Sequence, residues 1–244
     1  MSIHSLRPLP QRHPSDRRRL SYRQLSTLRF LIRALVLTVR RTPRYARAMR
    51  FVILATLLSL AAAAAPIETP AVGKAFGVPG APVAIEVFSD FECPACKTLH
   101  EQVLPSLMKD YVATGKVYLI HREFPLPQHT YSQLAASYAS AAARIGKYAP
   151  VANALFGKQS SWSVDGKVDE TACSVLSPVE ANKVRALVKD PSIAAEIRRD
   201  IQAGQKAALQ QTPTMIITFR MRQYPVSTTN YDLVRRFLDD LLAN

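Results

Sequence analysis

Cys93 and Cys96 are the reactive side chains that this sequence places closest together. Two cysteines separated by two residues can close into a small disulfide ring and open again by exchange through a mixed disulfide. The β-branched and aromatic residues at positions 84–88 predict a short buried strand just before them. The pair would then lie on the first turn of the helix that follows. This placement favours a redox-active dithiol.

The position of Cys93 at the start of a helix would favour its thiolate. Unpaired backbone N–H groups and the positive end of the helix dipole stabilise negative charge there and lower a thiol pKa. Pro94 suits the first helical position, because that position has no intrahelical N–H bond to lose. Cys93 is therefore the expected nucleophile, and Cys96, one turn further inside, the expected resolving thiol.

The two cysteines could instead form half of a zinc site, or simply pack in a core. Zinc would need two more ligands, and the sequence holds no second C-x-x-C and no H-x-x-x-H. His100 and Cys173 are the available candidates. Because the motif follows a strand and opens a helix, redox chemistry is favoured over metal binding. For Cys173, which has no sequence partner, a buried packing role is favoured over a regulatory or intermolecular disulfide.

The net charge of +14 is concentrated near the N-terminus of the 244-residue chain. Residues 1–50 hold 13 of the 32 basic residues, all of them Arg, and one of the 18 acidic residues. Residues 51–244 therefore hold 19 basic and 17 acidic residues. The body of the protein is close to neutral, and its charge gives no reason to expect nucleic-acid binding.

A signal peptide is predicted at residues 49–65. Met49 and Arg50 precede an apolar run at residues 51–60, and five alanines follow. A positive start, a short apolar run and a small-residue cleavage zone are typical of secretory signals. The predicted location is the periplasm or another extracytoplasmic space, where thiols persist as disulfides.

Residues 1–48 are interpreted as translated sequence upstream of the true start, or as a disordered basic tail. A basic membrane-surface helix at residues 25–39 and a twin-arginine signal around residues 17–19 are alternatives. They rank lower because Arg29 and Arg33 interrupt the apolar stretch that both would need.

Beyond the signal, the patterns predict strands and helices in a mixed order. Residues 66–82 predict an extended tail with one edge strand. The helix from Cys93 should be amphipathic and kink at Pro105, and its inner face is expected at Cys96, Leu99, Val103, Leu107 and Tyr111. The helix at 130–145 is expected to bury a stripe formed by Leu134, Tyr138, Ala142 and Ile145. No strand pattern occurs between residues 125 and 211, which indicates a helical insertion in a sheet protein. The first two strands should be parallel with a right-handed crossover, and the last two should form an antiparallel hairpin. The expected strands are 83–89, 116–124, 215–219 and 221–226, and the expected helices are 93–111, 130–145, 150–159, 169–176, 178–188, 190–209 and 233–241.

In this order the chain resembles the DsbA-like branch of the thioredoxin superfamily, the exported thiol:disulfide oxidoreductases. The resemblance covers nearly all of residues 76–242. It implies an α/β protein with a thioredoxin fold, a central mixed sheet flanked by helices, at residues 66–125 and 190–244. It also implies an inserted all-helical subdomain at residues 126–189. The motifs that carry it are F-S-D-F-E-C-P-A-C at 88–96, R-E-F-P-L-P-x-H at 122–129, K-D-P-x-I at 189–193 and T-P-T at 212–214.

The resemblance also implies roles for single residues. Cys93 matches the family's nucleophile and Cys96 its resolving cysteine. Pro94 and Ala95 match the variable dipeptide that helps to set the redox potential. The redox-active disulfide between the two cysteines is the expected reactive group, and no metal or other cofactor is implied.

A second family motif concerns the proline loop. Pro213 matches the family's cis-proline, and Thr212 matches the residue before it, which presents its backbone to the substrate peptide. A cis X-Pro bond is uncommon and is kept where a tight backbone geometry is needed.

The chain departs from the family at the buried glutamate six residues before the first cysteine. Val87 stands there, and the neighbouring Glu86 should point to the opposite face of the strand, so it cannot simply substitute. The Pro-Ala dipeptide also lacks the histidine of the strong oxidant DsbA, so we expect a less oxidising couple.

Charged residues near the motif act in both directions. Asp90 and Glu92 oppose a thiolate at Cys93, whereas Lys97 and His100 favour it. The sign of their sum does not follow from the sequence.

The leading hypothesis is an exported protein disulfide oxidoreductase that acts on cysteine-containing exported proteins. A monomeric oxidase is slightly favoured over a reductase or isomerase, because the sequence shows no added dimerisation segment. An oxidase would need a membrane or soluble redox partner. The alternatives are a soft-metal chaperone that uses Cys93, Cys96 and His100, and a structural domain with an inert disulfide.

Overall fold

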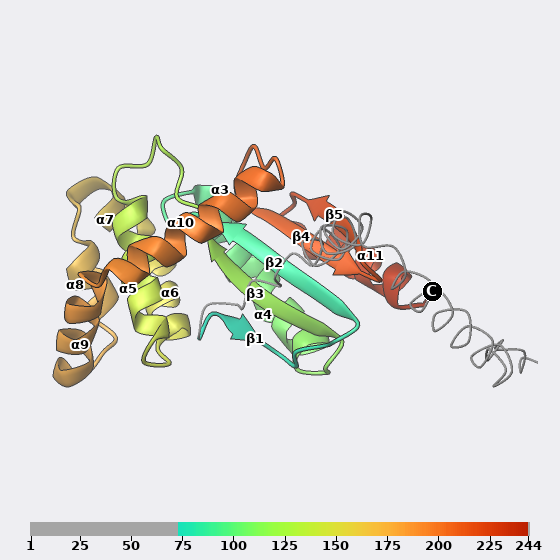
Figure 1. Cartoon of the computed structure of the whole chain (residues 1–244), viewed down its shortest axis with the longest axis horizontal. Helices are drawn as coiled ribbons and strands as arrows, with labels where there is room; N and C mark the ends of the chain where they lie inside the picture. Colours follow the sequence, from blue (N-terminus) through green and yellow to red (C-terminus); the bar gives the residue numbers. More distant parts are fainter. Residues whose placement is uncertain (1–72, 244) are drawn as a thin grey trace, which may run out of the picture. The chain divides into compact units, whose positions relative to one another are not determined.

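The computed structural model describes residues 73–243. The predictions for residues 1–48 and for the signal peptide at 49–65 lie outside the described residues. Within them, five strands form one mixed sheet in the order β1-β3-β2-β4-β5 (Figure 1). The strands are β1 (Ala75–Phe76), β2 (Val83–Ser89), β3 (Val117–Glu123), β4 (Thr214–Phe219) and β5 (Arg222–Val226).

The central strand β2 agrees with the predicted range of residues 83–89. It pairs with β3 in parallel and with β4 antiparallel, so both of its edges are hydrogen-bonded. The β4 and β5 strands form the expected antiparallel hairpin, and β1 is the expected edge strand, antiparallel to β3. The predicted central mixed sheet is confirmed.

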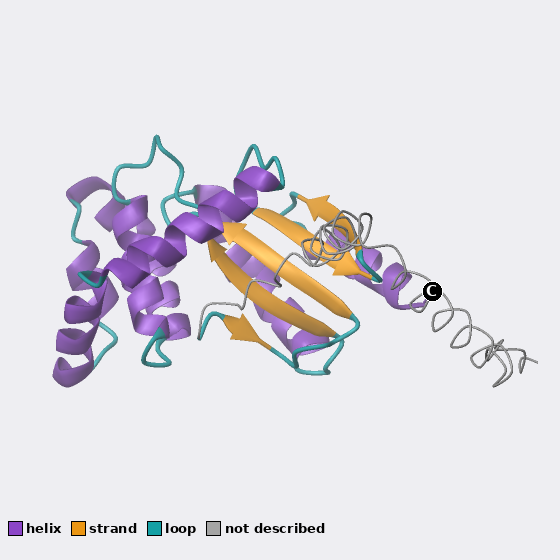
Figure 2. Ribbon diagram, viewed as in Figure 1, coloured by secondary structure: helices purple, strands orange, loops and turns teal. Residues whose placement is uncertain are grey.

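The two faces of the sheet are covered by different helices. On one face, Ile85 and Val87 pack in a core that includes Leu99 and Leu107 of the helix after Cys93 and Val234 of the C-terminal helix α11 (Tyr231–Ala243). On the other face, α10 (Pro191–Lys206) crosses the sheet (Figure 2). The carboxyl end of β2 therefore leads directly into α3 on one face of the sheet, while α10 covers the other face.

The helix after Cys93 differs from the prediction of a simple amphipathic α-helix. It consists of α3 (Pro94–Thr98), the π-helical segment η3 (Leu99–Val103), α4 (Leu104–Leu107) and the π-helical segment η4 (Met108–Val112). At the expected kink, the structure has the π-helical segment η3 just before Pro105. Proline has no N–H to donate to the preceding turn, and the wider π-helical turn accommodates it. The predicted inner face is buried throughout, at Cys96, Leu99, Val103, Leu107 and Tyr111.

The expected helical segment lies between β3 and α10. Its helices are α5 (Ser132–Ala143), α6 (Tyr148–Gly157), α7 (Gln159–Asp165), α8 (Val168–Cys173) and α9 (Pro178–Val188), and together they are called the helical insert below. They gather at one end of the sheet (Figure 1). The exact boundaries of the insert, residues 126–189, stay a prediction.

Three details of the helical predictions were wrong. Helix α7 was not predicted, because its seven residues are too few to show a clear period. Leu134 was assigned to the inner face of α5 but is 40% exposed, since that face packs closely through Ala135 and Ala139 instead. The α10 helix ends at Lys206, before the predicted residue 209, and Ala208 beyond it has a positive φ of 54°.

Among residues 73–243, no helix is both long enough and apolar enough to span a bilayer.

Candidate active site

Both motif cysteines lie where the end of β2 turns into a helix. Cys93 is the N-cap of α3 with extended backbone angles, and Pro94 occupies the first turn, as predicted. The two thiols are free, with Cys93 8% exposed and Cys96 fully buried. Pro94 and Ala95 lie exposed beside them. A substrate can therefore approach Cys93 and the dipeptide but not Cys96.

The surroundings of Cys93 stabilise its thiolate. The hydrogen bond with the Cys96 thiol contributes most and, together with Thr212 and the N–H groups of Cys96 and Ala95, lowers the pKa of Cys93 to about 5 although burial opposes this. Backbone N–H groups contribute because the start of α3 leaves them without intrahelical partners. At neutral pH Cys93 is a thiolate.

The surroundings of Cys96 have the opposite effect. Burial, followed by the hydrogen bond with Cys93, raises the pKa of Cys96. The backbone N–H of Asp90 donates to its sulfur at 3.4 Å. The pair is thus asymmetric, with one thiolate near the surface and one thiol held inside.

The proline loop lies against the nucleophile. The Thr212–Pro213 peptide bond is cis, and the Thr212 carbonyl oxygen lies 3.4 Å from the Cys93 sulfur, which donates to it only when it is protonated as a thiol. Thr214 anchors the loop, because its hydroxyl lies 2.8 Å from both the Gln211 carbonyl oxygen and the Ser227 hydroxyl. The four residues that the sequence singled out, Cys93, Cys96, Thr212 and Pro213, are brought together.

Asp90 has a role that sequence analysis missed. Its buried carboxylate accepts hydrogen bonds from the N–H groups of Glu92 and Leu126, from the Ser132 hydroxyl and from the His129 ring, at 2.6 to 2.8 Å. Asp90 was considered only as a charge that opposes a thiolate. It instead ties the active-site turn to the loop after β3 and to the start of α5.

Gln159 is a second residue that the sequence did not point to. Its side-chain amide donates to the carbonyl oxygens of Phe91 and Cys93. The sequence predicted Gln159 as the last residue of the helix at 150–159, whereas in the structure it begins the separate helix α7, so no pattern placed it at the site.

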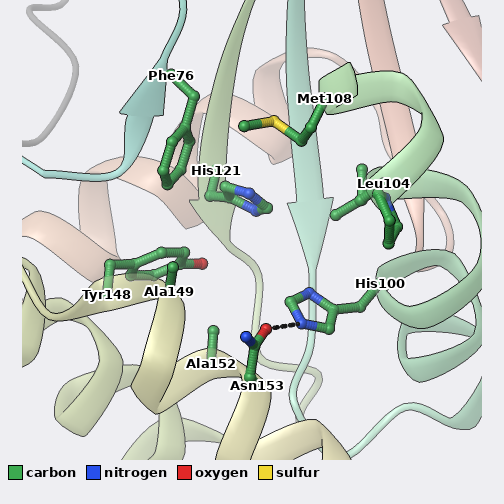
Figure 3. A pocket seen from close by; sticks show the side chains of 10 residues that line it. Phe76, His100, Leu104, Met108, His121, Tyr148, Ala149, Ala152 and Asn153 are labelled. Carbon is green, nitrogen blue, oxygen red and sulfur yellow. Dashed lines mark hydrogen bonds between the residues drawn. The ribbon is translucent and has the colours of Figure 1, made fainter. Parts of the chain in front are cut away.

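His100 does not face the thiolate as a positive charge. Its Nε2 lies 2.7 Å from Asn153 Oδ1, and burial lowers its pKa. It lines an apolar cavity of about 200 Å³ between α6, α4 and the edge of the sheet. His121 lines the same cavity (Figure 3), and burial lowers its pKa to about 3. Both rings are therefore neutral at pH 7.

The remaining metal candidates are also placed apart. Within residues 73–243, no three His, Cys, Asp or Glu side chains converge on one point that could hold a metal ion. Cys173 is buried in α8, and its thiol donates to Asp169 at 3.3 Å. Burial raises the pKa of Cys173 to about 11, which fits the packing role favoured for it. Among these described residues, no third His, Cys, Asp or Glu joins Cys93 and Cys96 at one point.

Glu86 lies on the face opposite Val87, as predicted. It pairs with Arg122 at 2.6 Å, and Arg122 also binds Asp200 of α10 at 3.1 Å. Another buried carboxyl, that of Glu123, lies at the end of β3 beside Lys74, and burial raises its pKa to about 7.

A family model described as thioredoxin matches residues 70–240. The chain belongs to the thioredoxin family. A curated relative, "Probable disulfide bond formation protein D" of Bacillus anthracis, is 23% identical over 172 residues, which cover 68% of this chain and 76% of the relative.

Solved structures of similar fold include BdbD and a DsbA protein. Oxidised BdbD from Bacillus subtilis has a TM-score of 0.59 at 21% identity, over 72% of this chain and all of that one. The α-DsbA1 of Wolbachia pipientis has a TM-score of 0.58 at 20% identity, over 70% of this chain and 90% of that one. The inserted helical subdomain on a thioredoxin fold is therefore confirmed.

Proposed function

We propose that this thioredoxin-family protein is an exported thiol:disulfide oxidoreductase that works mainly as an oxidase of protein thiols. The observation that carries the proposal is the asymmetry of the pair, a stabilised Cys93 thiolate beside a buried Cys96 thiol. Stabilising the thiolate favours the reduced enzyme, and a dithiol whose reduced form is stabilised is an oxidant. The names of the relatives, which refer to disulfide bond formation, support the same direction.

The reaction follows from which sulfur a substrate can reach. In the oxidised enzyme, a substrate thiolate attacks the Cys93 sulfur, the Cys93–Cys96 bond breaks, and Cys96 leaves and takes up a proton. A second substrate thiolate then attacks the substrate sulfur of the mixed disulfide and releases Cys93 as a thiolate. Two electrons pass from the substrate to the enzyme, and the substrate gains one disulfide.

The proline loop would hold the substrate during these steps. The Thr212 carbonyl oxygen lies next to the Cys93 sulfur, so an extended substrate segment that lies along Thr212 and Pro213 would bring its cysteine to that sulfur. Pro94 and Ala95 form the exposed surface on the other side and would tune the potential.

The remaining parts of the proposal concern the cell. A signal peptide at residues 49–65 would place the enzyme outside the cytoplasm, where its substrates are exported proteins with cysteines. A membrane or soluble partner would reoxidise it, and it would act as a monomer.

The reduction potential of the pair tests the direction. The full chain is equilibrated against glutathione buffers, and the fraction of free Cys93 is measured by alkylation. A potential between about −120 and −200 mV, the range of strong and moderate oxidants, is expected. A value below about −230 mV would contradict the oxidase role and favour a reductase.

A further inference from the structure

The side chain of Gln159 joins the helical insert to the active-site turn. Gln159 is the first residue of α7, and it is only 7% exposed. Its Nε2 donates to the Phe91 carbonyl oxygen at 2.7 Å and to the Cys93 carbonyl oxygen at 3.0 Å. One amide group thus spans the turn that carries the nucleophile.

These two carbonyl groups define how α3 begins. The Cys93 carbonyl also accepts the N–H of Lys97 at 3.2 Å, the first hydrogen bond of the helix. The Phe91 ring is held from the same side, because it packs on Phe156 of α6 with ring centroids 4.7 Å apart. A buried carbonyl that loses its donor is unfavourable, so without Gln159 the Phe91 carbonyl would reorient toward another partner. The Cys93 carbonyl would keep only the N–H of Lys97, and the turn between the two carbonyls would no longer be held from the helical insert.

The orientation of the Cys93 peptide group determines which hydrogen-bonding groups lie next to the Cys93 sulfur. The N–H groups of Ala95 and Cys96 hydrogen-bond to that sulfur, and the Thr212 carbonyl lies 3.4 Å from it. A rotation of the turn would move the sulfur away from these N–H donors. The hydrogen bonds made by Gln159 oppose that rotation.

We propose that Gln159 is a positioning residue that holds the Cys93 turn against the helical insert and thereby sets how much of Cys93 is thiolate. The inference rests on the proposed function, since it concerns the nucleophile of that reaction. It assigns the helical insert a direct part in the chemistry, through one amide group.

The test compares three variants of the full chain. Gln159→Met keeps the length of the side chain and removes the donor, and Gln159→Glu places a carboxylate before two carbonyl oxygens. Gln133→Glu makes the same charge change at an exposed position of α5 and is the control. The titration of Cys93 is followed by thiolate absorbance and by its rate of alkylation between pH 3 and 9.

We expect the Cys93 midpoint to rise by at least about half a pH unit in Gln159→Met, roughly a threefold change in the thiolate equilibrium, and by more in Gln159→Glu. Gln133→Glu should leave it unchanged. An unchanged midpoint in both Gln159 variants, with wild-type circular dichroism, would overturn the proposal.

Hydrogen exchange of the wild type gives an independent answer if the variants do not fold. The side-chain amide protons of Gln159 should exchange more slowly than those of Gln133, and equal rates would overturn the proposal. Wild-type exchange with glutathione is measured in parallel. A wild type that titrates as expected but exchanges no disulfides would contradict the proposed function, while the titration still decides the role of Gln159.

Discussion

The thiols of Cys93 and Cys96 are chemically identical, but their pKa values are shifted in opposite directions by their surroundings. Cys93 meets backbone N–H donors at the start of α3, whereas Cys96 is fully buried beside it. Neutral His100 does not supply the positive charge expected of it, and the Asp90 carboxylate is occupied by hydrogen bonds. The thiolate is therefore stabilised mainly by hydrogen bonds and not by charged side chains.

Replacing each cysteine should separate their roles. Cys93→Ser should abolish exchange with a reduced test protein, because no other sulfur is within reach of substrate. Cys96→Ala should accumulate mixed disulfides that non-reducing electrophoresis detects, since the resolving thiol is gone. Cys173→Ala is the control and should retain activity. Turnover by Cys93→Ser would contradict the mechanism.

The pH dependence of alkylation should show the asymmetry directly. The rate at Cys93 in the reduced protein should rise with a midpoint near pH 5, because its thiolate is present above that value and is lost below it. Labelled peptides identified by mass spectrometry should contain Cys93 at pH 6 and not Cys173, whose pKa is about 11. A Cys93 midpoint above pH 8 would show that the turn does not stabilise the thiolate.

Helix α10 packs closely against the sheet because one of its residues in contact with the sheet is a glycine. Gly204 lies in α10 against Phe124 and Phe88, and a Cβ at this position would overlap the Phe124 ring. The absence of a side chain lets the helix approach the strand ends that carry the site.

Gly204→Ala should therefore destabilise the protein. Overpacking of a buried contact costs about 1–3 kcal/mol, which exceeds the gain in helix propensity of about 1 kcal/mol. Gly157→Ala in α6 is the matched control, because no atom lies within 4 Å of its Cβ position, and it should be neutral or stabilising. Urea unfolding measures both, and equal stabilities of the two variants would contradict the close approach.

A buried charge cluster links three separate parts of the described chain. Lys74, next to β1, has no exposed side-chain surface and lies 2.8 Å from Glu196 and 2.9 Å from Asp200 of α10. Glu123 at the end of β3 lies 3.7 Å from the same ammonium group. Since a buried charge is stable only when paired, the cluster makes the sheet edge and α10 depend on each other.

Glu123 should make the stability of the protein depend on pH. Burial raises its pKa from 4.5 to about 7, so between these values the folded protein holds a proton that the unfolded chain releases. The contribution of this group is complete below pH 4.5 and is lost as pH rises to 7, by up to about 3 kcal/mol at ~1.4 kcal/mol per pKa unit.

Glu123→Gln should reduce the loss of stability between pH 5 and pH 8, measured by urea unfolding at both values. Glu170→Gln, which removes an exposed carboxylate of α8, is the control and should keep the wild-type difference. If Glu123→Gln loses as much stability as the wild type over this range, Glu123 does not carry the proton.

Local patterns in the sequence were sufficient for much of the architecture. The strand before Cys93, the crossover, the hairpin and the cysteine pair on a first helical turn follow from periodicity and motif, because each depends on residues close together in the chain. The resemblance added the loop of Thr212 and Pro213. What periodicity missed was short or irregular, such as α7 and the π-helical segments around Pro105.

The tertiary structure decided which distant groups meet. The amide of Gln159 reaches carbonyl groups more than sixty residues earlier, and Lys74 is buried by acids that lie 49 to 126 positions further on. Such contacts depend on how whole helices pack against the sheet. The sequence pattern around a polar residue such as Gln159 or Lys74 does not indicate that its side chain is buried. The sequence therefore specified the reactive sulfurs, and the packing of the helical insert specified the surroundings that make one of them a thiolate.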